Sequence, residues 1–112
     1  MIQAKRLFGY KIAENAQTTQ YTSGAGITTI IDKFTATNYS GSAASISVNL
    51  INSGGTAGND NIVTKTKTLQ PAEVYTFPEL VGQALDPSGF ISTIASAATS
   101  INIGANGRVI TT

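Results

Sequence analysis

The amino-acid sequence predicts an all-β protein, an antiparallel two-sheet β-sandwich or jelly roll with one short helical turn near residues 78–85. Apolar and polar residues alternate with a period of two over much of the chain, as they do in strands that bury one face. β-Branched residues are abundant (16 Thr and 13 Ile), whereas only 12% of the residues are charged. Clusters of Gly, Asn, Ser and Pro separate the alternating runs at short intervals, which is typical of sandwiches and jelly rolls.

The chain is long enough for one domain, and we expect a single β-sandwich domain over residues 18–112. Residues 1–17 are expected to form either an N-terminal arm or the first strand. Phe8, Tyr10 and Ile12 alternate with other residues, which suits both possibilities. Residues 18–22 are expected to add a short strand.

The next strand is expected from Ile27 to Tyr39, with Ile30, Phe34 and Ala36 on the face turned to the core. Asp32 would lie on the same apolar face if the alternation ran unbroken. A β-bulge at Asp32, or a place near the end of the sheet, would avoid burying its charge.

A second strand is expected from Ser45 to Leu50, where every second residue is apolar. The turn residues 38–42 lie between these two strands and predict a hairpin. Residues 52–61 contain the longest run of Gly, Asn and Ser, and we expect a loop there.

The C-terminal half predicts several short strands and the one helical segment. Pro78 suits the first position of a helix of about two turns that ends at Leu85. Asn106–Gly107 is a strong hairpin signal and predicts a turn between the last two strands. The strands are expected over residues 62–69, 74–77, 90–97, 99–103 and 108–111.

Charge and residue types exclude several classes of function. The net charge is near +1, and the seven basic residues are scattered along the chain, which argues against a nucleic-acid partner. No apolar run approaches the roughly 20 residues that span a bilayer, so no membrane partner is expected. The basic residues are Lys5, Arg6, Lys11, Lys33, Lys65, Lys67 and Arg108.

No motif predicts catalysis, a metal site or a cofactor site, and we expect a protein that is not an enzyme and has no small-molecule substrate. The chain has no Cys and no His, which removes thiol chemistry and histidine-based mechanisms. The loop residues Asn59–Asp60–Asn61 offer oxygen ligands for calcium, but their spacing matches no EF-hand. Asn38–Tyr39–Ser40 is a formal N-glycosylation triplet, of a kind that chance produces in a chain with 26 Ser and Thr.

The N-terminal segment is the candidate partner-binding site, because basic and aromatic residues adjoin there, a mixture that is common at protein interfaces. An ordinary first core strand would explain the same residues. The candidate residues are Lys5, Arg6, Leu7, Phe8 and Tyr10.

From about residue 18 to the C-terminus, the order of features resembles small virion proteins of tailed bacteriophages. Tyr21–Thr22 precedes a loop of small residues and then a strand that continues through Phe34–Asn38. A Ser-rich turn and the strand Ile46–Leu50 follow, and then the turn Leu69–Glu73 and the segment Leu85–Ile91. Such proteins often have an acid directly after the glycine of the last segment, where this chain has Phe90.

The resemblance implies a structural virion protein, a capsid cement or decoration subunit on the outer surface of the phage head, made in the host cytoplasm. Its partner would be the major capsid protein, bound across the junctions between subunits, and it would act as a homo-oligomer, a dimer or a trimer. The alternative is a tail-fibre or adhesin domain that binds carbohydrate or a receptor through the loop 52–61 together with a Tyr.

Overall fold

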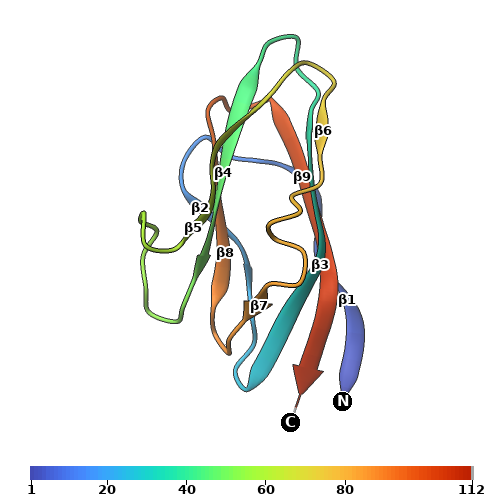
Figure 1. Ribbon diagram of the computed structural model, residues 1–112, viewed down its shortest axis with the longest axis vertical. Helices are drawn as coiled ribbons and strands as arrows, with labels where there is room; N and C mark the ends of the chain where they lie inside the picture. The colour runs from blue at the N-terminus through green and yellow to red at the C-terminus, as the bar shows by residue number, and fades with distance from the viewer. Residues whose placement is uncertain (112) are drawn as a thin grey trace.

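The computed structural model describes residues 1–111 and shows two antiparallel sheets packed face to face as a β-sandwich, which confirms the predicted fold class (Figure 1). Thr112, the last residue of the expected domain, lies outside the described residues. The strands are β1 (Ile2–Ile12), β2 (Thr18–Thr22), β3 (Ile27–Asn38), β4 (Ala44–Ile51), β5 (Ile62–Leu69), β6 (Val74–Tyr75), β7 (Ala84–Leu85), β8 (Phe90–Ala95) and β9 (Ile101–Thr111).

The two sheets divide the chain between them. The first sheet has the order β1-β9-β3-β6, and β7 also pairs with β3; the second has the order β2-β8-β4-β5. Because β1 pairs with β9, the two ends of the described chain lie side by side (Figure 1). The amino group of Met1 donates a hydrogen bond of 2.8 Å to the carbonyl of Thr111.

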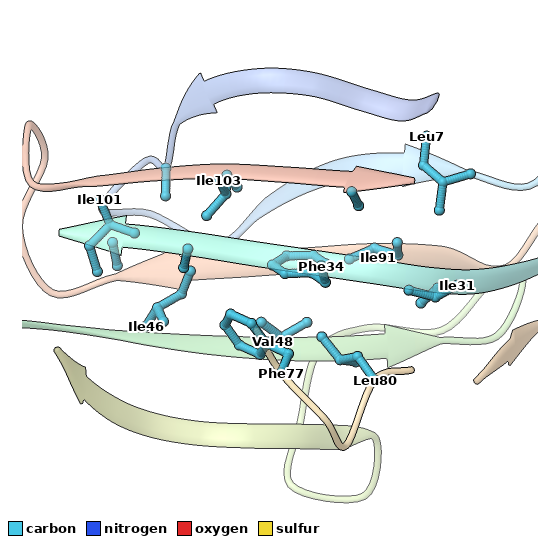
Figure 2. Packing of buried hydrophobic residues seen from close by; sticks show 14 of the residues in the cluster. Leu7, Ile31, Phe34, Ile46, Val48, Phe77, Leu80, Ile91, Ile101 and Ile103 are labelled. Carbon is cyan, nitrogen blue, oxygen red and sulfur yellow. The ribbon is translucent and has the colours of Figure 1, made fainter. Parts of the chain in front are cut away.

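Aromatic rings and aliphatic side chains fill the space between the sheets (Figure 2). The ring of Phe34 is fully buried and packs edge-on against Phe77, with 4.8 Å between the ring centroids, and against Phe8, at 5.6 Å. Ile46 and Val48 of β4 are buried and Leu50 is half-buried, which confirms the predicted inward face of that strand. Burial of each such side chain contributes about 2 kcal/mol to folding.

The bulge predicted in β3 is confirmed at Asp32. The register between β3 and β9 shifts between Ile31 and Lys33, and the side chain of Asp32 is exposed. The extra residue also moves the first half of β3 by one position, because side chains in a strand alternate between its faces. Ile31 is therefore buried, whereas Ile30, which we predicted to face the core, is turned outward.

The helical segment predicted over residues 78–85 is wrong, because turns and β7 occupy this segment. The backbone N–H of Gly82 donates to the carbonyl of Ile31 (2.7 Å), and the N–H of Ile31 donates to the carbonyl of Gln83 (2.9 Å). The N–H of Gly82 and the carbonyl of Gln83, which would form hydrogen bonds within a helix, are thus bonded to Ile31 of β3, next to the bulge. Pairing with a neighbouring strand outweighs a local helical preference of only two turns.

The hairpin predicted at Asn106–Gly107 is also wrong, since the expected strands 99–103 and 108–111 belong to one strand, β9. Gly107 lies between Lys5 of β1 and Ile31 of β3 and pairs with both. A two-residue hairpin of this type needs a positive φ at both central positions. Neither residue has one, because pairing on both sides requires an extended backbone there.

The hairpin predicted over residues 38–42 is wrong as well, because β3 lies in the first sheet and β4 in the second, and the two strands do not pair. The ranges predicted for the other strands differ from the structure only at their ends. The ranges predicted for β2 and β5 are confirmed, and β6 and β8 each end two residues earlier than we predicted. In the described part of the chain, no helix is long and apolar enough to cross a membrane.

Candidate partner-binding surface

The register of the first sheet brings two basic residues onto its outward face. Arg6 of β1 lies opposite Asn106 of β9, and Asn106 lies opposite Lys33 of β3. Residues paired across strands share a face of the sheet, and all three are exposed. Because neighbouring strands lie about 5 Å apart, the Cα atoms of Arg6 and Lys33 are about 10 Å from each other, with Asn106 between them.

A shallow hollow of about 430 Å³ adjoins this row, and we call it the basic hollow. The guanidinium of Arg108 approaches one carboxylate oxygen of Asp32 at 3.0 Å, and its Nε donates to both oxygens at 3.1 Å. The negative charge of Asp32 is therefore engaged, while Lys5 and Arg6 are in no ion pair among residues 1–111. The lining residues are Ala4, Lys5, Arg6, Asp32, Asn106 and Gly107.

The rest of this outward face is almost free of charge. Thr35 and Thr37 follow Lys33 at two-residue intervals along β3, so their hydroxyl groups lie on the same face. Asn102 of β9 pairs with Thr37 and adds an amide group to this face. The aromatic ring of Tyr10 lies over Gly104, where a Cβ atom would come within 2.6 Å of the ring. A residue larger than glycine at this position would therefore displace Tyr10.

Three large apolar side chains of the edge strand β1 are exposed. Ile2 is 64% exposed, Tyr10 66% and Ile12 47%. These three residues lie toward the two ends of the strand, and Lys5 and Arg6 lie between them. The exposed part of β1 therefore combines a basic centre with apolar ends.

The five residues predicted to bind a partner separate into two groups. Lys5, Arg6 and Tyr10 are exposed, as a contact residue must be. Leu7 is buried and Phe8 packs on the core through Phe34, so these two hold β1 in the sandwich. Residues 2–12 form a strand of the first sheet, the second of the two forms expected for this segment.

Sequence reasoning missed Lys33, Asn106 and Arg108 as neighbours of this segment. They lie on β3 and β9, far from β1 in the sequence, and only the pairing of the strands brings them together. The exposed Asp32 in the middle of an apolar run was the one signal of an outward-facing charge there.

The loop 52–61 borders a second hollow of about 430 Å³. The amide of Asn49 donates to the carbonyl of Gly58 (3.1 Å) and to Oδ1 of Asn61 (2.7 Å), which attaches the loop to the outer side of β4. The hollow contains the carboxylate of Asp60 but no aromatic ring, so the Tyr expected for a sugar site is not among its lining residues. Within residues 1–111 no three His, Cys, Asp or Glu side chains gather as metal ligands would.

A polar cluster joins β5 to the segment that follows β6. Thr64 donates a hydrogen bond to one carboxylate oxygen of Glu79, and the hydroxyl of Tyr75 donates to the other at 2.7 Å. The ammonium of Lys67 lies 4.8 Å from the centre of the Tyr75 ring. The cluster therefore connects β5, an edge strand of the second sheet, to the segment that follows β6 of the first sheet.

The hydrogen bonds in this cluster shift two pKa values in opposite directions. Burial raises the pKa of Glu79, but the hydrogen bonds from Thr64 and Tyr75 lower it, and the net pKa lies below the ordinary value of 4.5. The pKa of Tyr75 is raised above 10.0, first because its hydroxyl donates to the Glu79 carboxylate and then because of burial. We expect this cluster to influence stability rather than to act on a substrate.

Fold and surface together define a β-sandwich whose first sheet has one basic, partly apolar edge. No protein-family model matches this chain, and no curated protein or solved structure matches it either.

Proposed function

We propose that this protein is a structural subunit of a tailed-phage virion, a cement or decoration protein that binds the major capsid protein across subunit junctions on the outer surface of the head. The observation that carries the proposal is the part of the outward face of the first sheet that lies beyond the basic row, where Thr35, Thr37 and Asn102 present hydroxyl and amide groups and no charge. Such a face costs less to desolvate than a charged one and suits broad packing against another protein. The resemblance of the sequence to virion proteins of tailed phages suggests that this other protein is a capsid protein.

Repetition would make modest contacts sufficient for stable binding. A dimer or trimer on a symmetry axis of the capsid would engage several capsid subunits together, which converts weak single contacts into strong overall binding. A standard interface buries about 800 Å² on each partner. The long first sheet, with two 11-residue strands and one of 12 residues, offers a broad surface for such contacts.

The test measures binding to phage heads that were assembled without this protein. We expect the wild-type protein to sediment with the heads, and Thr37→Glu to bind at least about tenfold more weakly, because it places a charge in the neutral part of the outward face. Thr68→Glu is the matched control, since it adds the same charge at an exposed position of β5, in the other sheet. Heads that bind neither protein, or that bind Thr37→Glu as tightly as the wild type, would contradict the proposal.

The second candidate function is carbohydrate or receptor binding, as in a tail-fibre or adhesin domain. It is favoured by the hollow at the loop 52–61, where Asn52 and Asp60 supply polar side chains that could bond sugar hydroxyls. It ranks second because aromatic rings usually supply much of the affinity for sugars by stacking on them. Reproducible binding on a glycan array, lost in Asp60→Ala, would favour this function over the first.

A further inference from the structure

We propose that β1 binds an extended acidic segment of a partner protein as an additional strand of the first sheet. The inference rests on the proposed function only in taking the capsid protein as the owner of that segment. The juxtaposition that carries it is an unpaired strand edge beside the basic hollow.

The first observation is the open edge itself. β1 is the last strand of the first sheet, paired on one side with β9, and nothing in residues 1–111 pairs with its other side (Figure 1). The free side of such a strand presents unpaired N–H and C=O groups, to which an extended peptide can bind by main-chain hydrogen bonds. The register of β1 with β9 is regular from Ile2 to Arg6 and shifts twice between Arg6 and Lys11, so residues 2–6 offer the regular part of the template.

The second observation is the charge beside this edge. β1 carries Lys5, Arg6 and Lys11 and no acidic residue. Lys11 is neutralised by Glu14, whose carboxylate lies 2.9 Å from its ammonium, but Lys5 and Arg6 are in no ion pair in the described part of the chain. Lys33 is in no ion pair among residues 1–111 either, and it adds a further cation on the outward face, one strand beyond Asn106. An incoming strand with acidic residues would compensate this charge.

The same charge argues against a second copy of this chain as the occupant. Antiparallel pairing of two β1 strands about a two-fold axis would bring two copies of Lys5 and Arg6 into one short ribbon. Four cations with no acid between them destabilise a pairing of this kind. Lysine on an edge strand is a common means of preventing such self-association.

The exposed apolar residues at the ends of β1 indicate that the partner segment has apolar residues at its own ends. Ile2 lies before the basic centre, and Tyr10 and Ile12 lie after it. Because alternate residues of a strand share a face, acids two residues apart in the middle of the segment would lie on the same side as Arg6. We therefore expect a segment with alternating Glu or Asp in its middle and apolar residues at its ends.

The test uses the whole protein and a short synthetic peptide in which Glu alternates with Thr and Val stands at both ends. Nuclear magnetic resonance titration gives the affinity and shows which backbone amides respond. We expect the amides of residues 2–12 to respond, and the affinity to fall at least tenfold when Gln replaces Glu in the peptide. Backbone N-methylation of the peptide removes hydrogen-bond donors without changing its charge and should abolish binding.

Two protein variants locate the site. Arg6→Glu should weaken binding of the Glu peptide at least tenfold, and Lys5→Glu repeats the test at a second exposed position of β1. Lys65→Glu is the matched control, because Lys65 is an exposed cation on β5, the edge strand of the other sheet, and it should leave the affinity unchanged.

Several outcomes would overturn the inference. No binding of the Glu peptide, equal binding of the N-methylated peptide, or an equal loss in Lys65→Glu would each exclude strand addition at β1. Full competition by inorganic phosphate or by duplex DNA would show a general anion site instead. A dimer in sedimentation analysis that Arg6→Glu disrupts would mean that a second copy occupies the edge.

The capsid assay separates this inference from the proposed function. If the protein binds heads and Arg6→Glu binds them equally well, the proposed function stands and strand addition is wrong. If the Glu peptide binds at β1 but heads do not bind, the inference about the edge stands and the capsid is not the partner.

Discussion

Asn38 shows how a single buried amide can connect several segments of this sandwich. Its side chain is completely buried, and its Nδ2 donates to the carbonyl of Ser42 (2.8 Å) and to that of Leu69 (2.9 Å), at the end of β5. Its Oδ1 accepts hydrogen bonds from the backbone and the hydroxyl of Ser40. Asn38 belongs to the Asn-Tyr-Ser triplet of the sequence, and in the folded chain its amide nitrogen is not accessible for glycosylation.

At Glu79 the arrangement of individual side chains predicts how stability depends on pH. A carboxyl whose folded-state pKa is depressed stabilises the fold above its unfolded pKa, and this contribution disappears as the pH falls through the folded pKa. We therefore expect Glu79→Gln to be less stable than the wild type at pH 7. The difference in free energy of unfolding should shrink as the pH is lowered below about 4.5, and urea unfolding over that range measures it.

Asp60→Asn is the control for this pH dependence, because it removes an exposed carboxylate of the loop 52–61 and leaves the Glu79 cluster intact. It should retain the pH dependence that the wild type owes to Glu79. If Glu79→Gln differed from the wild type by the same amount at pH 7 and at pH 3, the hydrogen bonds from Thr64 and Tyr75 would not favour the charged form of Glu79.

At the scale of the element, β9 depends on glycine at position 107, where the backbone of β3 approaches it closely. A Cβ atom at Gly107 would lie 2.1 Å from the carbonyl oxygen of Ile30, and this neighbour is backbone, which cannot turn away as a side chain can. The contact also explains why Asn106–Gly107 occurs inside a strand. This glycine permits a close approach of two backbones, whereas in a hairpin it would permit a positive φ.

Gly107→Ala should therefore separate β3 from β9 locally and lower the free energy of unfolding by about 3 kcal/mol, as overpacked sites do. Gly41→Ala is the matched control, because no atom lies within 4 Å of a Cβ atom built there and Gly41 has no positive φ. Its effect should stay within about 0.5 kcal/mol. Equal urea midpoints for the two variants would show that β3 can move aside without cost.

At the scale of the whole molecule, the pairing of β1 with β9 holds the two ends of the described chain, residues 1–111, together. The register runs from Ile2 opposite Ile110 to Ile12 opposite Asn102. Leu7 and Phe8 of β1 also pack in the core. The N-terminal segment is thus part of the sandwich, so its removal affects folding as well as any contact with a partner.

Deletion of residues 1–9 should accordingly lower the free energy of unfolding by at least about 3 kcal/mol, since it removes two packed side chains and uncovers an edge of β9. The double variant Lys5→Ala/Arg6→Ala keeps the strand and should change stability by less than about 1 kcal/mol. Urea unfolding followed by circular dichroism measures both. A deletion variant as stable as the wild type would mean that β1 is a detachable arm.

The sequence by itself determined the fold class and most strand ranges, and it offered a bulge at Asp32 as one of two ways to keep that carboxylate exposed. These features follow from local patterns, namely alternation with a period of two, turn residues, and a carboxylate that cannot be buried without a partner. Ser45 to Leu50 was predictable for the same reason, because its pattern is complete within one strand.

Only the tertiary structure decided which segments pair, and this pairing overrode two strong local signals. Residues 78–85 lack a helix because Ile31 bonds to their backbone, and Asn106–Gly107 lacks a turn because β1 and β3 bind β9 from both sides. The candidate surface also depends on pairing, since Arg6 and Lys33 become neighbours of Asn106 only in the sheet. Contacts between residues far apart in the sequence leave no periodic signal in it, and such contacts form the candidate surface of this protein.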